Sequence, residues 1–376
     1  MNPGESLPSP GTQELPTSLR IPHPNHSSPS QRPSIEHAII SPVPKISSPK
    51  DCNDYRPISV TLVLTRTMDR MVVRTFMYPA LLTPPPALMF SDQYAFRPSG
   101  STTAALVFLL QTITNLLAEQ PYVVLIALDF SKAFDTVRHS TLLQKLASLD
   151  IPDTVYNWLV DYFSGHSHCT EFRGHISTFL NVSASTVQGS AIGPVSYVVN
   201  AGDLTPLTLG NVFCKYADDT YLVIPASNVD SRTREIENIR SWSCANNLNL
   251  DLKKSSEIVF VDSMRRRQIQ LSSLLEGIPR VCPLIILGIT INSHFSVSEH
   301  VSCVISKCAQ TIQALRILRS HWLCNDALNL VYRSSYWQTP LCSERVVEFH
   351  LSSWPSAYGS ARQTRRSIWP LRSRHT

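Results

Sequence analysis

Three acidic residues stand where carboxylates are uncommon. Asp129 directly follows an apolar run at residues 122–128, and Asp218 and Asp219 interrupt the otherwise apolar segment 211–226. Buried carboxylates are costly unless they are paired or bind a metal, and Mg²⁺ prefers oxygen ligands. Two such ions a few ångströms apart support in-line phosphoryl transfer. If the three residues converge, they predict metal-dependent phosphoryl chemistry; an ordinary solvated turn at Asp218 and Asp219 is the alternative that spacing leaves open.

The elements that would position these carboxylates follow from the hydrophobic pattern. Residues 122–128 are continuously apolar and rich in β-branched side chains, which predicts a buried strand ending at Asp129. Residues 211–226 consist of two apolar halves around a polar bend, which predicts a hairpin with acid at its tip. Residues 101–119 begin with a Ser/Thr cap signal and repeat leucine and isoleucine at helical spacing, which predicts an amphipathic helix.

The rest of the chain continues this mixture of strands and helices. Helices are predicted at 139–149, 153–164, 194–201, 231–247 and 300–320, single strands at 257–262 and 284–291, and a polar hairpin at 167–185. This order predicts an α+β fold with a central antiparallel sheet packed on helices.

Several short motifs follow one another along the chain. They are 43–45 (VPK) with 55–59 (YRPIS), 93–98 (QYAFRP) leading into 101–103 (STT), 128–139 (LDFSKAFDTVRH), 188–194 (QGSAIGP), 216–219 (YADD), Trp242 with 247–251 (NLNLD) and 254–255 (KS), and 287–291 (LGITI) with His300. In sequence and order they resemble the motifs of reverse transcriptases from non-LTR (LINE-type, jockey- or CR1-like) retrotransposons. The resemblance runs from about residue 39 to about 335 and implies a right-hand polymerase with fingers, palm and a partial helical thumb.

The resemblance implies an RNA-directed DNA polymerase, a nucleotidyltransferase that adds deoxynucleotides to a primer 3′-hydroxyl with two Mg²⁺ ions, or Mn²⁺ in their place. It implies that Asp129 and Asp218 are the main metal ligands, that Asp219 supports them, and that the backbone carbonyl of Phe130 contributes. The implied partners are an RNA template, a DNA primer and deoxynucleoside triphosphates.

Positively charged residues match further positions of the family. Lys45 and Arg56 match the finger positions that hold the incoming triphosphate, although exposed loops also carry ordinary solvated cations. Lys254 matches the lysine that protonates the leaving pyrophosphate as a general acid. Lys253 beside it is the alternative for that role.

Four other residues match positions that contact substrates. Phe134 matches the steric gate that excludes a 2′-hydroxyl, with a core aromatic as the alternative. Gln188 and Gly189 match the segment that contacts nucleotide and template, where glycine permits close backbone approach. Tyr216 matches a residue that supports the primer end, and a packed hairpin aromatic describes it equally well.

The ends of the chain differ from the matching region. Residues 1–38 are rich in proline and serine and predict a disordered leader. We predict fingers and palm at 39–262 and the primer grip and partial thumb at 263–335. Residues 336–376 form a divergent basic tail, which we hypothesise to be a frameshift product. The formal net charge of +5 equals the charge of the five arginines within residues 351–376. The remaining chain therefore has no net formal charge, and its charge indicates no particular binding partner.

Two alternatives to an active polymerase of this kind remain. One is a truncated, catalytically inactive relic that at most binds nucleic acid, since the 38 residues ahead of the matching region are not expected to form an endonuclease. The other, a group II intron-type or telomerase-type polymerase, is disfavoured by the wording of the YRPIS and NLNL motifs. The first residues show no secretory signal and no apolar run approaches the ~20 residues of a membrane helix, so the chain is expected to lie in the nucleus or cytoplasm, away from membranes.

Overall fold

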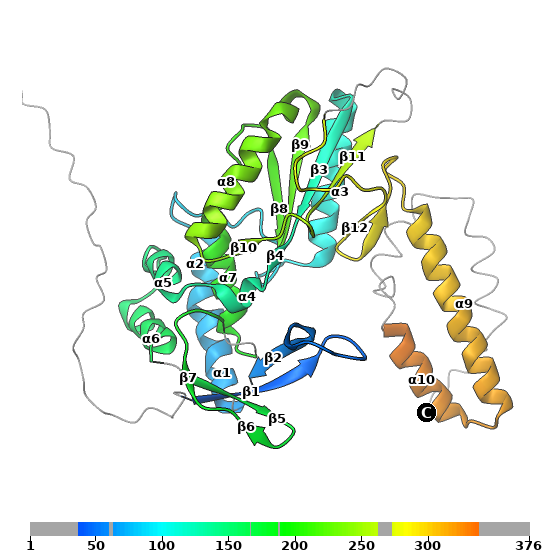
Figure 1. Cartoon of the computed structure of the whole chain (residues 1–376), viewed down its shortest axis with the longest axis horizontal. Coiled ribbons are helices and arrows are strands. Elements are labelled where there is room, and N and C mark those ends of the chain that lie inside the picture. The colour runs from blue at the N-terminus through cyan, green and yellow to red at the C-terminus, as the bar shows by residue number, and fades with distance from the viewer. Residues whose placement is uncertain (1–36, 60–62, 166, 187–188, 262–272, 338–376) are drawn as a thin grey trace, which may run out of the picture. The chain divides into compact units, whose positions relative to one another are not determined.

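The computed structural model describes residues 37–59, 63–165, 167–186, 189–261 and 273–337 (Figure 1). Two compact units share these residues. One is formed by the chain up to Phe90 together with Phe134–Asp203, and the other by Ser91–Ala133 and the chain from Leu204 onward. The predicted domain boundary at 262/263 falls in a segment outside the described residues, and so do nearly all of the predicted leader and tail, so these boundaries stay predictions.

The first unit combines a small mixed sheet with helices. In its sheet β1 pairs antiparallel with β2 and parallel with β5, and β5 pairs antiparallel with β6 and β7. The strands are β1 (His37–Pro44), β2 (Tyr55–Ser59), β5 (Ser167–Phe172), β6 (His175–Ile176) and β7 (Leu180–Asn181). The helical segments are η1 (Cys52–Asp54), α1 (Val63–Val72), η2 (Val73–Met77), α2 (Tyr78–Leu82), α5 (His139–Ala147), α6 (Asp153–Phe163), α7 (Ile192–Asn200) and η3 (Ala201–Asp203). The short helix α4 (Ala133–Thr136) lies where the chain passes into this unit.

The second unit is built on a four-stranded antiparallel sheet with the order β11–β3–β9–β8 (Figure 1). Two smaller pairs, β10–β4 and β12–β13, accompany it. Its strands are β3 (Tyr122–Leu128), β4 (Phe130–Ser131), β8 (Val212–Tyr216), β9 (Asp219–Pro225), β10 (Asn249–Leu250), β11 (Ser256–Val261), β12 (Leu284–Ile286) and β13 (Ile289–Ile291). Its helical segments are α3 (Thr102–Glu119), η4 (Ala226–Ser231), α8 (Arg232–Ala245), α9 (Ser298–Ser320) and α10 (Asn325–Trp337).

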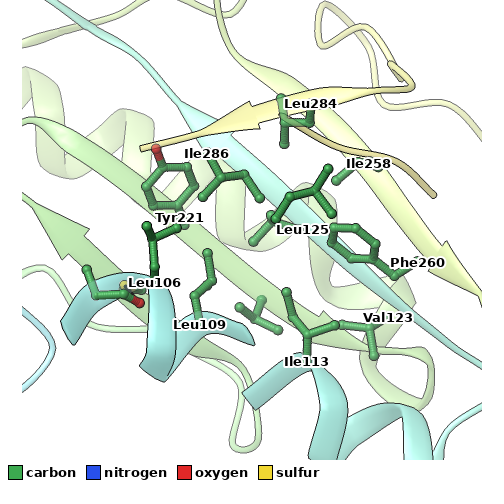
Figure 2. Close-up of a cluster of buried hydrophobic side chains, with 14 residues drawn as sticks. Leu106, Leu109, Ile113, Val123, Leu125, Tyr221, Ile258, Phe260, Leu284 and Ile286 are labelled. Atoms are coloured by element: carbon green, nitrogen blue, oxygen red, sulfur yellow. Dashed lines mark hydrogen bonds between the residues drawn. The ribbon is translucent and has the colours of Figure 1, made fainter. Parts of the chain in front are cut away.

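The core of the second unit lies between α3 and the sheet. Figure 2 shows Leu106, Leu109 and Ile113 of α3 facing side chains of the sheet such as Leu125 and Phe260. The alternate residues of β3, for example Val124 and Ile126, are equally buried. Both faces of this strand are therefore covered, which explains its continuous apolar sequence. Each such side chain contributes roughly 1.5–3 kcal/mol through burial.

Helix α3 begins as its sequence predicts. Ser101 is the N-cap, and its hydroxyl oxygen accepts a hydrogen bond of 3.0 Å from the backbone N–H of Ala104. Among the described residues, α3 is the single helix that is long and apolar enough to cross a membrane. Its residues Ala105, Leu106, Leu109 and Ile113 are buried against the sheet, as in the core helix of a globular domain.

A buried ionic cluster ties α8 to the sheet. Glu257 of β11 is 1% exposed and pairs with Arg232 at 2.8 Å. Arg280 donates from Nε to the same carboxylate at 2.6 Å. Two guanidinium groups thus compensate one carboxylate that burial would otherwise make costly.

The predicted α+β fold with a central antiparallel sheet is confirmed, and so are the predicted helices, the strand ending before Asp129 and the hairpin around Asp218. One prediction is wrong: residues 284–291 form two strands, β12 and β13, rather than one. The chain reverses at Leu287 and Gly288, whose φ angles are +46° and +88°. Leucine is rarely found at positive φ, so a turn that begins at Leu287 is poorly signalled by the sequence.

Candidate active site

The tip of the β8–β9 hairpin carries two of the three predicted carboxylates. Tyr216 of β8 lies opposite Asp219 of β9, so Ala217 and Asp218 alone form the turn. Ala217 has φ +57°, while Asp218 is absent from the positive-φ residues. A positive φ at the first central residue only is the pattern of a type II′ turn, whose twist matches that of the flanking strands. The turn holds Asp218 at the end of a buried sheet.

Asp129 lies at the same end of that sheet. Strand β3 pairs antiparallel with β9, and the last pair of the register is Leu128 opposite Thr220. Asp129 follows Leu128, and Asp219 precedes Thr220. Because the strands are antiparallel, both aspartates lie at the hairpin-tip end of the sheet. The carboxylates separated by about 90 residues in sequence therefore meet in the second unit.

Electrostatic interactions link the three carboxylates. Burial, a backbone interaction and the Asp129 charge act on Asp218, and the net effect is a raised pKa. Burial also raises the pKa of Asp219 to about 6, with further contributions from the charges of Asp218 and Asp129. Asp219 is nevertheless exposed to solvent, so it is desolvated on one side only. The site thus collects negative charge that it does not itself neutralise.

One cation reaches this cluster. Burial raises the pKa of Asp129, the nearby Lys254 charge acts to lower it, and Asp251 acts to raise it. Lys254 pairs with Asp251 at 3.3 Å, from Nζ to Oδ2. Asp251 in turn donates its backbone N–H to the carbonyl oxygen of Asp129 at 2.9 Å. Of the two predicted alternatives, Lys254 rather than Lys253 is the lysine whose charge acts on Asp129.

The side chains of this site suit a hard divalent cation, because the oxygen atoms that Asp129, Asp218 and Asp219 offer all belong to carboxylates. Within the described ranges, no group of three or more His, Cys, Asp or Glu side chains is arranged to hold an ion alone. Mg²⁺ is often bound by one or two carboxylates together with substrate phosphates. The residues present fit an ion whose coordination is completed by water in the free protein and by phosphates when substrate is bound.

Phe130 and Tyr216 flank the carboxylates. Phe130 is buried, belongs to β4, and its ring lies 5.8 Å from that of Trp242 in an edge-to-face arrangement. Tyr216 is half-buried and packs beside the core cluster under α3. Its position opposite Asp219 is compatible with both roles predicted for it, and its contact with a primer stays a prediction.

Lys45 and Arg56 lie together on the β1–β2 hairpin of the first unit. Arg56 is opposite Val43, and Lys45 continues the ladder with its backbone N–H bonded to the carbonyl of Asp54 at 2.7 Å. Since residues two apart share a face of a strand, both cations lie on one face. Both are exposed, and the Lys45 ammonium donates to the carbonyl of Asn53 at 2.8 Å.

Phe134 and Gly189 also belong to the first unit, and Gln188 lies outside the described residues. The half-buried ring of Phe134 lies 4.7 Å from the ring of the buried Tyr197. Gly189 has φ +121°, and a Cβ atom there would lie 2.6 Å from the carbonyl oxygen of Ser59. Glycine is therefore required at this position, for its φ and for its lack of a side chain.

Two residues of the site escaped sequence analysis although they lie in the quoted motifs. Asp251 links Lys254 to the backbone of Asp129. Gln93 bonds to the backbone of the Ala217–Asp218 turn. The position of Asp251 three residues before Lys254 was a visible signal that the two could pair. The role of Gln93 left no such signal, because it depends on a contact across 124 positions.

Comparison with known proteins agrees with this geometry. Residues 43–291, more than half of the chain, match the family model described as reverse transcriptase (RNA-dependent DNA polymerase). The "Probable RNA-directed DNA polymerase from transposon X-element" of Drosophila melanogaster is 23% identical over 305 residues, which cover 78% of this chain and 32% of the relative. The "RNA-directed DNA polymerase from mobile element jockey" of the same organism is 23% identical over 295 residues, covering 73% and 30%. The chain thus spans about a third of the length of these curated relatives.

A solved structure shares the fold. The telomerase from Candida tropicalis, in complex with a fragment of telomeric RNA, superposes with a TM-score of 0.50 at 12% identity, covering 70% of this chain and 44% of that one. This likeness supports the predicted right-hand polymerase fold. The relatives confirm the resemblance to polymerases of non-LTR retrotransposons that the motifs predicted. Because the family model spans more than half of the chain, including β3 and the β8–β9 hairpin, the chain belongs to the reverse transcriptase (RNA-dependent DNA polymerase) family.

Proposed function

We propose that this chain is the polymerase module of a non-LTR retrotransposon and that it catalyses RNA-directed DNA synthesis. In this reaction a primer 3′-hydroxyl attacks the α-phosphate of a deoxynucleoside triphosphate, and pyrophosphate leaves. The observation that carries the proposal is the meeting of Asp129, Asp218 and Asp219 at one end of a buried sheet. Burial raises the pKa of all three carboxyl groups, and neighbouring carboxylates add to the effect, so a cation bound here would stabilise their charged forms.

The reverse transcriptase family generally uses divalent metal ions. Here Asp129 and Asp218 would hold Mg²⁺ or Mn²⁺, with support from Asp219 and the backbone carbonyl of Phe130. When bound, the ions supply charge that activates the attacking hydroxyl and neutralises the triphosphate. The chain itself contributes a rigid sheet end, which keeps the carboxylates together despite their repulsion.

Lys254 is the candidate general acid. Its side chain is about two thirds exposed, at 62%, and is held near Asp129 by its pairing with Asp251. This arrangement would let the ammonium group reach a leaving pyrophosphate oxygen and deliver a proton to it. A positive charge beside the carboxylates would also attract the triphosphate.

The first unit would supply the other substrate contacts. The exposed cations Lys45 and Arg56 share one face of a hairpin, where both would donate charge-assisted hydrogen bonds to the triphosphate. Phe134 would lie under the sugar as a steric gate, and Gln188 and Gly189 would contact the nucleotide and the template. Tyr216 of the second unit would support the primer end.

Primer extension on an RNA template tests the proposal directly. Wild-type protein with Mg²⁺ and deoxynucleotides should extend a DNA primer, and Asp218→Asn should lower the rate at least about 100-fold, because metal-supplied charge stabilisation is worth several kcal/mol. Asp230→Asn is the matched control, since Asp230 is an exposed carboxylate just beyond β9. Equal activity of wild type and Asp218→Asn would overturn the site assignment. A wild-type protein that binds a primer–template duplex without extending it would favour the inactive relic.

A further inference from the structure

Gln93 is a buried residue whose side chain contacts the backbone of the Ala217–Asp218 turn. It is 3% exposed. Its Oε1 accepts hydrogen bonds from the backbone N–H of Ala217 at 2.9 Å and of Ala95 at 3.0 Å. Its Nε2 donates to the carbonyl oxygen of Ala217 at 3.5 Å. One amide group therefore bonds both backbone groups of the residue that precedes Asp218.

The turn needs such a partner. Ala217 occupies the turn between Tyr216 and Asp219, so its backbone groups have no partner in the β8–β9 ladder. It is also only 8% exposed, and buried backbone groups without a hydrogen bond are destabilising. In addition, its φ of +57° is unfavourable for alanine. A carboxamide, which has both an acceptor and donors, satisfies both backbone groups without adding charge beside three carboxylates.

Gln93 is itself held in place by strand β8. The backbone N–H of Lys215 donates to the carbonyl of Asp92 at 2.7 Å, and that of Tyr94 donates to the carbonyl of Lys215 at 2.8 Å. The buried Lys215 ammonium also pairs with the Asp92 carboxylate at 2.9 Å. Residues 92–94 thus pair with β8 as a short extended segment, and the Gln93 side chain extends from this segment to the turn.

We infer that Gln93 is a positioning residue for catalysis, which fixes the Ala217–Asp218 turn and thereby the direction of the Asp218 carboxylate. The catalytic part of this inference rests on the proposed function, whereas the positioning of the turn rests on the hydrogen bonds of Gln93. A displacement of about 1 Å in a reacting group can cost on the order of 100-fold in rate, so loosening this turn should affect the chemical step more than substrate binding.

The test compares Gln93→Met, which keeps the length of the side chain but loses its hydrogen bonds, with Gln111→Met on the exposed face of α3. We expect Gln93→Met to lower kcat by about 10- to 100-fold with little change in KM for the primer–template. We also expect a weaker Mn²⁺ affinity, measured by calorimetry without nucleic acid. Replacing Ala217 by glycine in the Gln93→Met protein should restore part of the kcat, because glycine tolerates the turn without help. Gln111→Met should leave all three quantities unchanged.

These readouts separate the inference from the proposed function. If wild-type protein extends no primer, the proposed function fails, and Mn²⁺ affinity alone then decides the inference: a loss in Gln93→Met but not in Gln111→Met supports it. Equal Mn²⁺ affinities, or equal kcat values in an active protein, overturn it. If Gln93→Met does not fold, amide hydrogen exchange of the wild-type protein decides. A slowly exchanging Ala217 amide supports the inference, and exchange at the rate of an unbonded turn amide overturns it.

Discussion

Two turns of the molecule, one in each unit, are held by a polar side chain that lies far away in the sequence. In the second unit Gln93 bonds to the backbone of Ala217, 124 positions later. In the first unit Asp69 of α1 accepts a hydrogen bond of 2.5 Å from the hydroxyl of Ser190, 121 positions later. The Ser190 oxygen in turn accepts from the backbone N–H of Ile192 at the start of α7.

The chemistry of the two supports differs. Gln93 is neutral and bonds to Ala217, the residue that precedes Asp218 in the carboxylate cluster. Asp69 is a fully buried carboxyl group whose pKa burial raises, against the opposing effect of hydrogen bonds from Ser190 and Ala191. A neutral amide therefore supports the turn where another negative charge would add to repulsion. An ionisable carboxyl group supports the turn whose identified interactions include no other carboxylate.

The turns also differ in the residue that takes positive φ. The first unit places Gly189 there, with backbone of Ser59 in the way of any side chain. The second unit places Ala217 there and supports it with Gln93. Four substitutions, each with a matched comparison, test this contrast.

The largest effect is expected from Lys215→Met in the second unit. Removing the ammonium leaves Asp92 buried without its ion-pair partner, which should lower the free energy of unfolding by about 3–5 kcal/mol. Lys145→Met in the first unit is the comparison, since the Lys145–Asp203 pair is 2.7 Å long but more exposed, and its loss should cost about 1 kcal/mol. Urea denaturation of both variants measures the difference. Equal losses would show that burial does not distinguish the two pairs.

Gly189→Ala should have the next largest effect. The new methyl group would meet the Ser59 carbonyl oxygen, and the φ of +121° is strained for alanine, so a loss of about 1–3 kcal/mol in unfolding free energy is expected. Gly165→Ala is the control for φ alone, because Gly165 has φ +71° with no atom within 4 Å of an added Cβ. A loss for Gly189→Ala no larger than for Gly165→Ala, in thermal unfolding of the two proteins, would exclude the crowding by Ser59.

Asp69→Asn should stabilise the protein at neutral pH, by less than Gly189→Ala destabilises it. The folded-state pKa of Asp69 lies above the unfolded value of 3.8, so its contribution to stability is present below pH 3.8 and is lost as the pH rises through the folded pKa. Asparagine keeps an oxygen that accepts from Ser190 and does not titrate. The advantage of the variant should therefore open above pH 3.8 and close below it, as measured by urea denaturation across pH. The same advantage at every pH would contradict this origin.

Ala217→Gly should have the smallest effect, a gain of about 0.5 kcal/mol. Relief of the positive φ is worth roughly 1–2 kcal/mol, and the added freedom of glycine in the unfolded chain offsets about 0.4–1 kcal/mol. The same substitution at Ala104 of α3 should instead cost about 1 kcal/mol. Chemical denaturation distinguishes these signs, and a loss at Ala217 as large as at Ala104 would indicate that the turn is unstrained.

The sequence predicted those parts of the fold that depend on local patterns. The continuous apolar residues of β3, the cap at Ser101 and the polar bend at Asp218 each leave a signal within a few positions. The contacts of Gln93 with Ala217 and of Glu257 with Arg280 leave none, because partner residues far apart in the chain are joined only by the tertiary fold. The β12–β13 turn was missed for a third reason, since Leu287 takes a positive φ that its side chain does not favour.

Binding of Mn²⁺ to the protein without nucleic acid measures whether Asp129 and Asp218 act as one metal-binding unit. Calorimetry on wild type, Asp129→Asn, Asp218→Asn and the control Asp230→Asn requires no turnover. If the two carboxylates act together, either active-site substitution weakens Mn²⁺ binding at least about tenfold, and the double variant loses little more than either single one. Asp230→Asn should bind Mn²⁺ as wild type does. Wild-type affinity in both Asp129→Asn and Asp218→Asn would contradict this joint role.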